Sequence, residues 1–311
     1  MRQLIMNRLI TAIVSFFCLT SLYGRDIVPF VIDSISYRPL VEVYVNNDSV
    51  PFNFILDTGC STVMANTQNS RLMGLLNLCE NDTVEYAHSS AIVRKTAFDN
   101  KLMLGSLIVD SIQIVANKAP LTDYDGVIGQ QLLDRFSKVG ILPDSKIIVF
   151  CKKEEPLGIA NAVKLPLVKG CGVYGTNLTI KTDSCEVPGV FMLDTGFEGV
   201  LSVNSNFSNN HNLPDILKKI GNLSSGDGAG VETKFLLVTA PRLVFANESM
   251  PLLPIILDQV QFQNEWESVF NGLIGYDLLK RFRMIWDYDN MTIILSPSFE
   301  YFSPVTSINR Q

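Results

Sequence analysis

The sequence predicts a mostly β chain that folds as two similar lobes related by a pseudo-twofold axis, with short helices between the strands. Three observations support this fold class. Short apolar runs with the alternation of strands dominate the chain, few stretches have helical periodicity, and one half of the sequence repeats in the other. The 311 residues can bury a proper core as one large domain or as two small ones.

The most informative repeat ends each of two apolar runs with an acid, a hydroxyl and a glycine. It reads Phe54-Ile55-Leu56-Asp57-Thr58-Gly59 in the first half and Phe191-Met192-Leu193-Asp194-Thr195-Gly196 in the second, 137 residues later. One such triplet would mean little. Two copies predict two half-domains that bring two carboxylates to one point.

A second repeat follows each copy of the first. Residues 126–136 match residues 272–282 at seven of eleven positions, and Gly129 aligns with Gly275. The same offset continues through two apolar runs, Lys146–Val149 and Thr292–Leu295. The chain is therefore an internal duplication of about 130 residues. Two copies can close around a pseudo-twofold axis, so that a site on the axis receives the same residue from each half.

Periodicity predicts the individual elements within this duplication. The expected strands are Val41–Val45, Phe52–Leu56, Leu102–Val109, Ile112–Val115, Gly172–Ile180 and Val190–Leu193. The expected short helices are Gln130–Phe136, Pro214–Ile220 and Tyr276–Phe282. The polar segment Asn204–Asn212 is expected to be flexible.

We divide the chain into a signal peptide at 1–24, a first lobe at 25–151, a linker at 152–164 and a second lobe at 165–311. Arg2 and Arg8 precede an apolar run that ends near Leu22, which is typical of a secretory signal peptide. The run is shorter than the ~20 residues that a membrane span needs. An uncleaved anchor is the weaker alternative, and Cys18 leaves a lipoprotein as a third. We expect a secreted or periplasmic protein.

Charge and metal-ligand content exclude several classes of partner. The net charge is −6 and becomes −8 once the two arginines of the leader are removed, and the chain has no lysine-rich run. We therefore expect no nucleic-acid partner. Only two histidines occur and the cysteines lack metal-ligand spacing, so we expect neither a metal nor a cofactor. Five cysteines remain after the leader. Cys171 with Cys185 and Cys60 with Cys79 are both possible disulfides, and the odd number leaves one cysteine unpaired.

The doubled motif has a chemical logic of its own. An aspartate at the end of a buried strand is costly unless it is balanced. The adjacent hydroxyl can hydrogen-bond across the interface, and the glycine lets the backbone turn sharply with its N–H close to the carboxylate. Two carboxylates within hydrogen-bond range cannot both ionise easily, so they share a proton. Such a pair can hold a water, with one carboxylate as general base and the other as general acid toward a carbonyl.

At these residues the chain resembles the pepsin/retropepsin-like aspartic protease superfamily, and most of all the bacterial secreted retropepsin-like proteins with two lobes in one chain. The resemblance runs from Pro39 to about Leu295. It implies that Asp57 and Asp194 are catalytic and that Thr58 and Thr195 make hydroxyl contacts between the lobes. It also implies that four glycines support the active site, namely Gly59, Gly196, Gly129 and Gly275.

The chain departs from that pattern directly after each Asp-Thr-Gly. Members of the superfamily usually have Ser, Thr or Ala there, whereas this chain has Cys60 and Phe197. We expect weaker hydrogen bonding to the outer carboxylate oxygen, most clearly at Asp194, and an activity optimum above strongly acidic pH. Two segments are candidates for a flap that covers the substrate. They are Val84–Arg94, with Tyr86 as a possible substrate contact, and Ser224–Thr233.

These features together predict an aspartic endopeptidase that hydrolyses peptide bonds of a polypeptide substrate. It would act as a monomer, by a water activated between two aspartates, without metal, cofactor or covalent intermediate. The alternative is a non-catalytic peptide- or protein-binding module on the same fold. A third possibility is a maturation or self-processing protease that needs one dedicated partner. Retention of both aspartates favours the enzyme.

Overall fold

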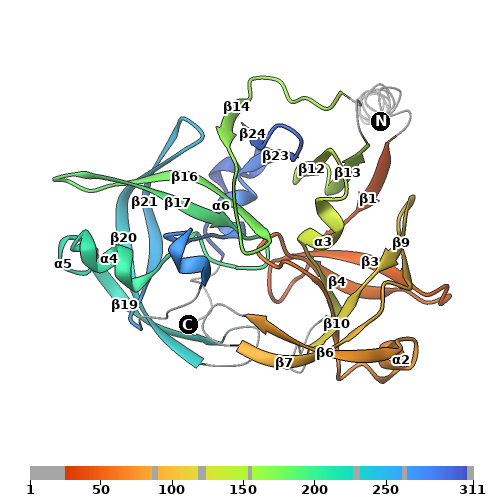
Figure 1. Ribbon diagram of the computed structural model, residues 1–311. Coiled ribbons are helices and arrows are strands. Elements are labelled where there is room, and N and C mark those ends of the chain that lie inside the picture. The colour runs from red at the N-terminus through yellow and green to blue at the C-terminus, as the bar shows by residue number, and fades with distance from the viewer. Residues whose placement is uncertain are drawn as a thin grey trace, which may run out of the picture.

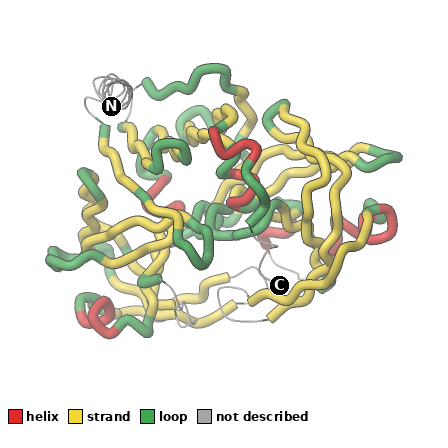
Figure 2. The backbone as a smooth tube through the Cα atoms, turned by 180° about the vertical axis from the view of Figure 1, so that it is seen from behind, coloured by secondary structure: helices red, strands yellow, loops and turns green. Residues whose placement is uncertain are grey.

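The computed structural model describes residues 25–85, 90–117, 124–152, 156–226, 232–260 and 265–306. The predicted signal peptide, Tyr86 and His88 lie outside these residues. The described chain is built mainly of strands in three sheets, one for each half of the sequence and a third shared by both (Figures 1 and 2). This confirms the predicted fold class. No helix within these ranges is long and apolar enough to span a membrane.

The first half forms a ten-stranded sheet. Its path is β6(Leu78–Glu85), β7(Ser90–Thr96), β10(Ile114–Asn117), β5(Val63–Asn66), β11(Gly126–Ile128), β4(Phe52–Leu56), β3(Pro39–Val45), β8(Asn100–Leu104) and β9(Leu107–Ile112), with β2(Val31–Ile32) paired to β3. In β3 the alternation that was expected from the sequence is present, since Val41, Val43 and Val45 are buried and Glu42 is exposed.

The second half forms an eight-stranded sheet with the same central pairing. Its order is β15(Val168–Gly170), β16(Val173–Lys181), β17(Glu186–Leu193), β22(Gly272–Ile274), β18(Leu201–Val203), β21(Glu248–Asp258), β20(Glu232–Phe245) and β19(Lys218–Gly226). Strand β11 lies between β4 and β5, parallel to the first and antiparallel to the second, and β22 lies in the same way between β17 and β18. The duplication in the sequence is therefore a duplication of topology.

The third sheet takes strands from both halves. Its order is β1(Asp26–Pro29), β13(Ile147–Cys151), β12(Lys138–Leu142), β23(Phe282–Asp287), β24(Thr292–Pro297) and β14(Val163–Pro166). At its centre β12 pairs antiparallel with β23, with Lys138 opposite Asp287 and Ile141 opposite Met284. In the repeat Lys138 corresponds to Met284 and Ile141 to Asp287, so this pairing is reciprocal and the pseudo-twofold axis passes between the two strands. The predicted division between residues 164 and 165 falls inside β14.

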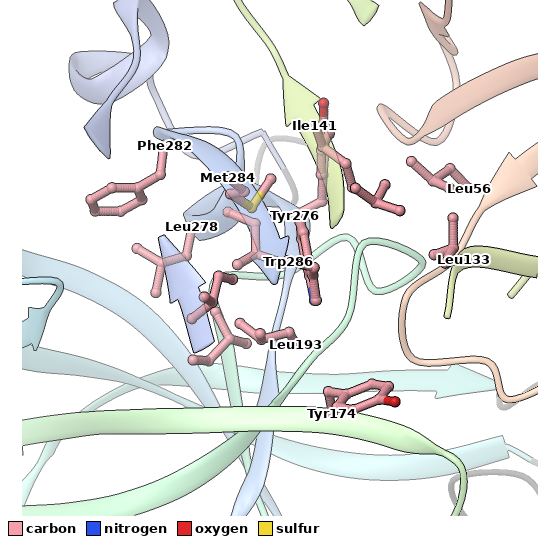
Figure 3. Close-up of a cluster of buried hydrophobic side chains, with 14 of the residues drawn as sticks. Leu56, Leu133, Ile141, Tyr174, Leu193, Tyr276, Leu278, Phe282, Met284 and Trp286 are labelled. Carbon is pink, nitrogen blue, oxygen red and sulfur yellow. The ribbon is translucent and has the colours of Figure 1, made fainter. Parts of the chain in front are cut away.

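One hydrophobic cluster extends through both halves. Leu56 and Leu133 of the first half approach Leu193, Leu278 and Trp286 of the second in the region drawn in Figure 3. The strands that end at the two aspartates therefore rest on a shared core, and the two loops are held by the same packed side chains.

Helices are short, as expected, but several bounds differ from the prediction. They are α2(Ser70–Gly74), α3(Gln130–Leu133), α4(Ser205–Asn210), α5(Leu213–Ile216), α6(Tyr276–Leu279) and the 3-10 turns η1(Glu265–Ser268) and η2(Phe299–Phe302). The Asn-rich segment predicted to be flexible contains α4, because the Asn204 side chain accepts the N–H of Phe207 and caps the helix. The run Leu102–Val109 is two strands, since Gly105 with a φ of +53° turns the chain between β8 and β9.

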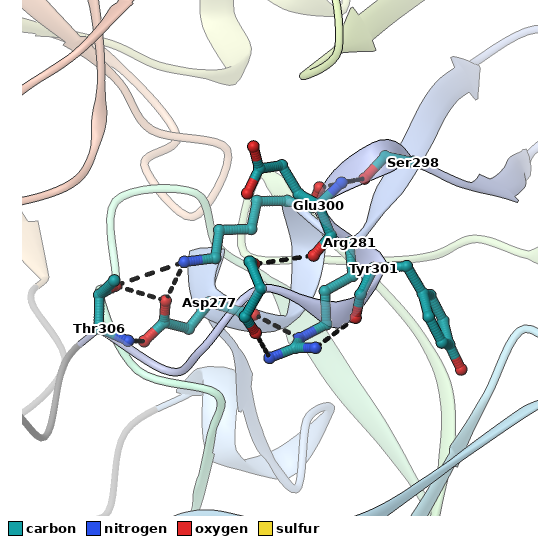
Figure 4. Close-up of polar contacts among 8 residues, drawn as sticks. Asp277, Arg281, Ser298, Glu300, Tyr301 and Thr306 are labelled. Atoms are coloured by element: carbon teal, nitrogen blue, oxygen red, sulfur yellow. Dashed lines mark hydrogen bonds and ion pairs between the residues drawn. The ribbon is translucent and has the colours of Figure 1, made fainter.

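The arginine in each copy of the second repeat anchors a neighbouring segment. Arg281 donates to the carbonyl oxygens of Tyr301 and Ser303 (Figure 4). Asp277 of α6 binds Lys280 and both the N–H and the hydroxyl of Thr306. In the first half Arg135 donates to the carbonyl oxygens of Asp110 and Ser111. This part of the repeat is structural: it fixes the short helix behind each aspartate loop.

Candidate active site

Asp57 and Asp194 occupy equivalent places, each directly after the strand of its own apolar run. The N–H of Asp57 donates to the carbonyl oxygen of Ile128 at 3.0 Å. The N–H of Asp194 donates to the carbonyl oxygen of Ile274 at 2.9 Å. Because β4 and β17 run parallel to β11 and β22, both loops leave their sheets in the same way. The structure thus brings together the two residues singled out in the sequence.

Thr58 and Thr195 join the two loops by mirrored hydrogen bonds. The Thr58 hydroxyl donates to the carbonyl oxygen of Leu193 at 2.8 Å and accepts the N–H of Thr195 at 3.0 Å. The Thr195 hydroxyl donates to the carbonyl oxygen of Leu56 at 2.7 Å and accepts the N–H of Thr58 at 3.0 Å. Both threonines are fully buried, so each bond is shielded from water. These are the contacts between lobes that the resemblance implied.

The glycines of the two motifs let the carboxyl groups approach. A Cβ atom on Gly59 would overlap the carboxyl group of Asp194, and one on Gly196 would overlap that of Asp57. Each glycine N–H also donates to the aspartate of its own loop, at 2.9 Å for Gly59 and 2.8 Å for Gly196. Any side chain at either position would push the two loops apart.

The two carboxyl groups form one coupled acid pair. They share a hydrogen bond, and both residues are half-buried. Burial raises the pKa of Asp194 well above its ordinary value, and the charge of Asp57 raises it further. Burial also raises the pKa of Asp57, but hydrogen bonds from Asp194 and from the N–H of Gly59 oppose the rise. The two carboxyl groups therefore titrate as one pair that shares a proton.

Arg38 makes the pair asymmetric. Its guanidinium donates to the carbonyl oxygen of Gly196 at 3.1 Å, lies 3.6 Å from the Glu198 carboxylate and lowers the pKa of Asp57. The corresponding position in the second half of the sequence is Leu165, which has no charge. We did not single out Arg38 from the sequence. The signal was the repeat itself, in which Arg38-Pro39-Leu40 corresponds to Leu165-Pro166-Leu167.

The residues after each Asp-Thr-Gly contribute their main chain to the site. The N–H of Phe197 donates to Asp194 Oδ1 at 3.0 Å, and the N–H of Cys60 hydrogen-bonds Asp57. The Cys60 thiol instead points to the carbonyl oxygen of Thr62 at 3.3 Å. Burial, with the nearby charge of Asp57, raises the pKa of that thiol to about 12. Cys60 therefore stays protonated and is not a nucleophile.

Gly129 and Gly275 lie directly behind the two loops. A Cβ atom on Gly129 would meet the carbonyl oxygens of Thr62 and Cys60, and one on Gly275 would meet that of Gly199. The residues that follow the two glycines hold the same loops. The N–H of Gln130 donates to the carbonyl oxygen of Cys60, and the N–H of Tyr276 donates to the carbonyl oxygen of Phe197. The placement expected for these two glycines is therefore present.

Gln130 is a second residue that sequence reasoning missed. Its side-chain amide donates to the carbonyl oxygen of Thr58 at 2.9 Å and accepts the Tyr288 hydroxyl at 3.0 Å. Tyr288 follows β23, so this buried chain of bonds ties the first aspartate loop to the shared sheet. The corresponding residue of the second half is Tyr276, and the sequence repeat gives no sign of the bond.

Both candidate flaps are antiparallel hairpins. Strands β6 and β7 form one hairpin, and β19 and β20 form the other. The end of each hairpin at which its first strand stops and its second strand begins faces the other hairpin in Figure 1. Val84 and Val93 of the first hairpin pack in one cluster with Met64 and Cys60, next to the aspartate loop. Tyr86 falls outside the described residues, so its role as a substrate contact stays a prediction.

Neither possible disulfide is present. Neither Cys171 with Cys185 nor Cys60 with Cys79 is bonded; Cys79, Cys171 and Cys185 are exposed, and Cys151 is buried. Across the described ranges no group of three or more His, Cys, Asp or Glu side chains is placed to hold a metal ion.

Comparison with known proteins agrees with this geometry. Residues 41–132 match the model of a protein family described as aspartyl protease. The crystal structure of the aspartic proteinase from Irpex lacteus is similar, with a TM-score of 0.61 and 14% sequence identity over 91% of this chain and 100% of that one. The fold is that of the pepsin/retropepsin-like aspartic proteases. No curated protein sequence matches the chain. The resemblance seen in the sequence is thus confirmed, in fold along nearly the whole chain and in sequence over part of the first lobe of this aspartic-protease fold.

Proposed function

We propose that the protein is an aspartic endopeptidase in which Asp57 and Asp194 activate a water for attack on a peptide carbonyl. The observation that carries this proposal is the pair of hydrogen-bonded carboxyl groups where the two lobes meet, fixed by the mirrored threonine contacts.

The asymmetry around the pair supports a different role for each aspartate. Asp57 is the ionised partner, because Arg38 lowers its pKa, whereas the N–H groups of the two loops hydrogen-bond both carboxyl groups alike. It accepts a proton from the water as general base. Asp194 carries the shared proton and donates it toward the carbonyl oxygen of the substrate, which gives a tetrahedral intermediate. Asp57 then gives its proton to the amide nitrogen as the C–N bond breaks, and a hydroxyl proton of the intermediate passes to Asp194, which regenerates the acid pair.

The substrate would be an extended polypeptide lying across both carboxyl groups, between the two hairpins. Strands β6, β7, β19 and β20 offer main-chain groups on both sides of that path. Closing of such hairpins over a substrate would exclude bulk water from the reacting carbonyl.

The test is cleavage of an unfolded protein mixture by the purified protein from about pH 3 to 8, the range in which coupled carboxyl groups change protonation. Products are identified by mass spectrometry. We expect Asp57→Asn and Asp194→Asn each to lower the rate by about 10²–10⁴-fold or more. Asp110→Asn, at an exposed position in β9, is the matched control and keeps the wild-type rate.

Absence of cleavage by a folded sample at every pH would overturn the proposal. The result would then favour the binding module, which requires peptide affinity without turnover. Cleavage that persists in both aspartate variants would also overturn it, because the activity would come from elsewhere in the sample or the chain.

A further inference from the structure

The peptide group between Thr58 and Gly59 is hydrogen-bonded at both ends. Its N–H, from Gly59, donates to Asp57 Oδ1 at 2.9 Å. Its carbonyl oxygen, from Thr58, accepts the side-chain amide of Gln130 at 2.9 Å. Because the peptide bond is conjugated, a donor at the carbonyl oxygen draws electrons away from the nitrogen and makes the N–H a stronger donor. The bond from Gln130 therefore strengthens the bond to the aspartate.

Tyr288 starts this chain of hydrogen bonds, since its hydroxyl donates to Gln130 Oε1 at 3.0 Å. The neighbours fix the orientation of the amide. The carbonyl oxygen of Thr58 can only accept, so the NH2 group of Gln130 faces it and the amide oxygen is left for the hydroxyl. Burial raises the pKa of Tyr288 well above its ordinary value, so the hydroxyl stays protonated at every pH between about 3 and 8. All donors of this amide relay (Tyr288, Gln130 and the Thr58–Gly59 peptide group) point toward Asp57.

The amide relay is held in place and away from water. Gln130 is 1% exposed and Thr58 is fully buried. The main-chain N–H of Tyr288 donates to the carbonyl oxygen of Ser137 at 3.0 Å, and its ring lies edge-on to that of Tyr174, with the centroids 5.1 Å apart. Where water does not compete, each hydrogen bond of such a chain strengthens the next by about 10–30%. The effect is therefore delivered to the aspartate rather than lost to solvent.

The second lobe has no corresponding relay. In the sequence repeat Tyr276 corresponds to Gln130, and Leu142 corresponds to Tyr288. Tyr276 has no amide group, and Leu142 has no hydrogen-bonding side chain. The equivalent glycine N–H of the second loop donates to its own aspartate at 2.8 Å without this support. The amide relay therefore acts on only one aspartate of the pair.

Both side chains of the amide relay are neutral, so their replacement leaves every neighbouring charge in place. The ionisable groups next to Asp57 are Asp194, Arg38 and the protonated thiol of Cys60. Those around Tyr288 are Tyr174, Asp134 and Lys169, the last two being 3.4 Å apart. A shift in the titration of Asp57 after such a replacement would therefore come from the hydrogen bonds and not from a lost charge.

We propose that Gln130 and Tyr288 are positioning residues that polarise the Thr58–Gly59 peptide group and so stabilise the negative charge of Asp57. This inference rests on the proposed peptidase function, in which Asp57 is the general base. Tyr288 follows β23 of the shared sheet and comes from the other half of the chain. The charged form of the general base is thus favoured only when the two halves of the chain are joined.

The test compares two variants that interrupt the amide relay with one that leaves it intact. Gln130→Met removes the amide at nearly constant volume, and Tyr288→Phe removes only the hydroxyl. We expect the acidic limb of the kcat/KM profile to move to higher pH, by about 0.2–0.6 pH unit in Tyr288→Phe and by about 0.5–1 in Gln130→Met. KM should stay within about twofold, because Gln130 is buried behind the loop. Tyr174→Phe, which loses a hydroxyl next to the relay, keeps the wild-type limb.

The amide proton of Gly59 gives a second readout that needs no substrate. In proton–nitrogen NMR spectra of glycine-labelled protein, its chemical shift follows the strength of its hydrogen bond to Asp57 and titrates with that carboxyl group. We expect this signal to move upfield and to titrate at higher pH in Gln130→Met and in Tyr288→Phe. The signal of Gly196, which makes the equivalent bond in the second loop, should move less.

The outcomes separate this inference from the proposed function. A merely structural role would lower the rate equally at every pH. An unmoved limb with an unmoved Gly59 signal in both variants therefore overturns the relay and leaves the peptidase intact. A shift in Tyr174→Phe as large as that in Tyr288→Phe would also overturn it. If the wild type cleaves no peptide, the peptidase proposal fails, and the pH at which the Gly59 signal titrates decides on the relay alone. Tyr288→Phe provides the test if Gln130→Met does not fold.

Discussion

Arg38 of the first lobe lies 3.6 Å from the carboxylate of Glu198 in the second, and its guanidinium also binds the main chain of Gly196. The contact crosses between the lobes beside the acid pair and has no counterpart on the opposite side, where Leu165 takes the place of the arginine. Arg38 thus makes the surroundings of Asp57 and Asp194 unequal.

Removal of this cation should shift the acidic limb of the pH–rate profile. Arg38 lowers the pKa of Asp57, so Arg38→Leu raises that pKa and Asp57 becomes protonated at higher pH. The acidic limb of kcat/KM then moves to higher pH, while Arg38→Lys keeps the charge and stays near the wild type. Profiles measured between about pH 3 and 8 on a cleaved peptide check this. A shift to lower pH in Arg38→Leu would contradict the assignment of Asp57 as the base.

Thr58→Ala should weaken the join between the lobes. It leaves the carbonyl oxygen of Leu193 and the N–H of Thr195 buried and unpaired, each at a cost of about 1–3 kcal/mol. We expect the free energy of unfolding in urea to fall by about 2–5 kcal/mol, together with activity. Thr58→Ser keeps the hydroxyl and should lose only about 1 kcal/mol for the missing methyl group. Equal losses in the two variants would show that the hydroxyl contributes nothing.

Gly129→Ala should lower stability and activity far more than Gly74→Ala does. The new methyl group would overlap the main-chain oxygens of Thr62 and Cys60, which form the loop after Asp57 and cannot move independently of it. Overpacking of this kind costs about 1–3 kcal/mol or more, and the displaced loop should lower kcat. Gly74→Ala is the control: nothing lies within 4 Å of the new atom at the end of α2, and stability should change by less than about 1 kcal/mol. Thermal unfolding of both variants decides between these expectations.

The pH dependence of stability should report on Asp258. Burial raises its pKa in the folded protein to about 7 from an ordinary value of 3.8, so the folded state binds the proton more tightly than the unfolded state. Its contribution to stability is fully present below 3.8 and is lost as the pH rises through about 7. Relative to Asp258→Asn, the wild type should therefore lose up to about 4 kcal/mol between pH 4 and 8. Urea unfolding at several pH values measures the difference, and parallel curves for the two proteins would contradict the raised pKa.

The acid pair was predictable because each half of it is encoded locally. Asp57-Thr58-Gly59 and its second copy lie at strand ends that the apolar pattern marks, and the repeat supplies the reason for them to meet. The shared sheet was not predictable in the same way. Its central pairing joins β12 to β23, more than a hundred residues apart, and only tertiary packing selects that partner.

Other differences came from single residues that override a pattern. Gly105 divides an apolar run that is continuous in the sequence, and Asn204 starts a helix in a segment without an apolar face. Arg38 was missed because its partners, Gly196 and Glu198, lie in the other half of the sequence.

The reciprocal pairing of β12 with β23 also bears on how the chain folds during synthesis. Until β23 has left the ribosome, β12 has no partner on one side and presents a row of free N–H and C=O groups at the edge of its sheet. An isolated first lobe would have the same open edge. Because the pairing is nearly self-symmetric, a second first lobe could occupy the place of β23, so that a half-length chain would associate with itself rather than remain single.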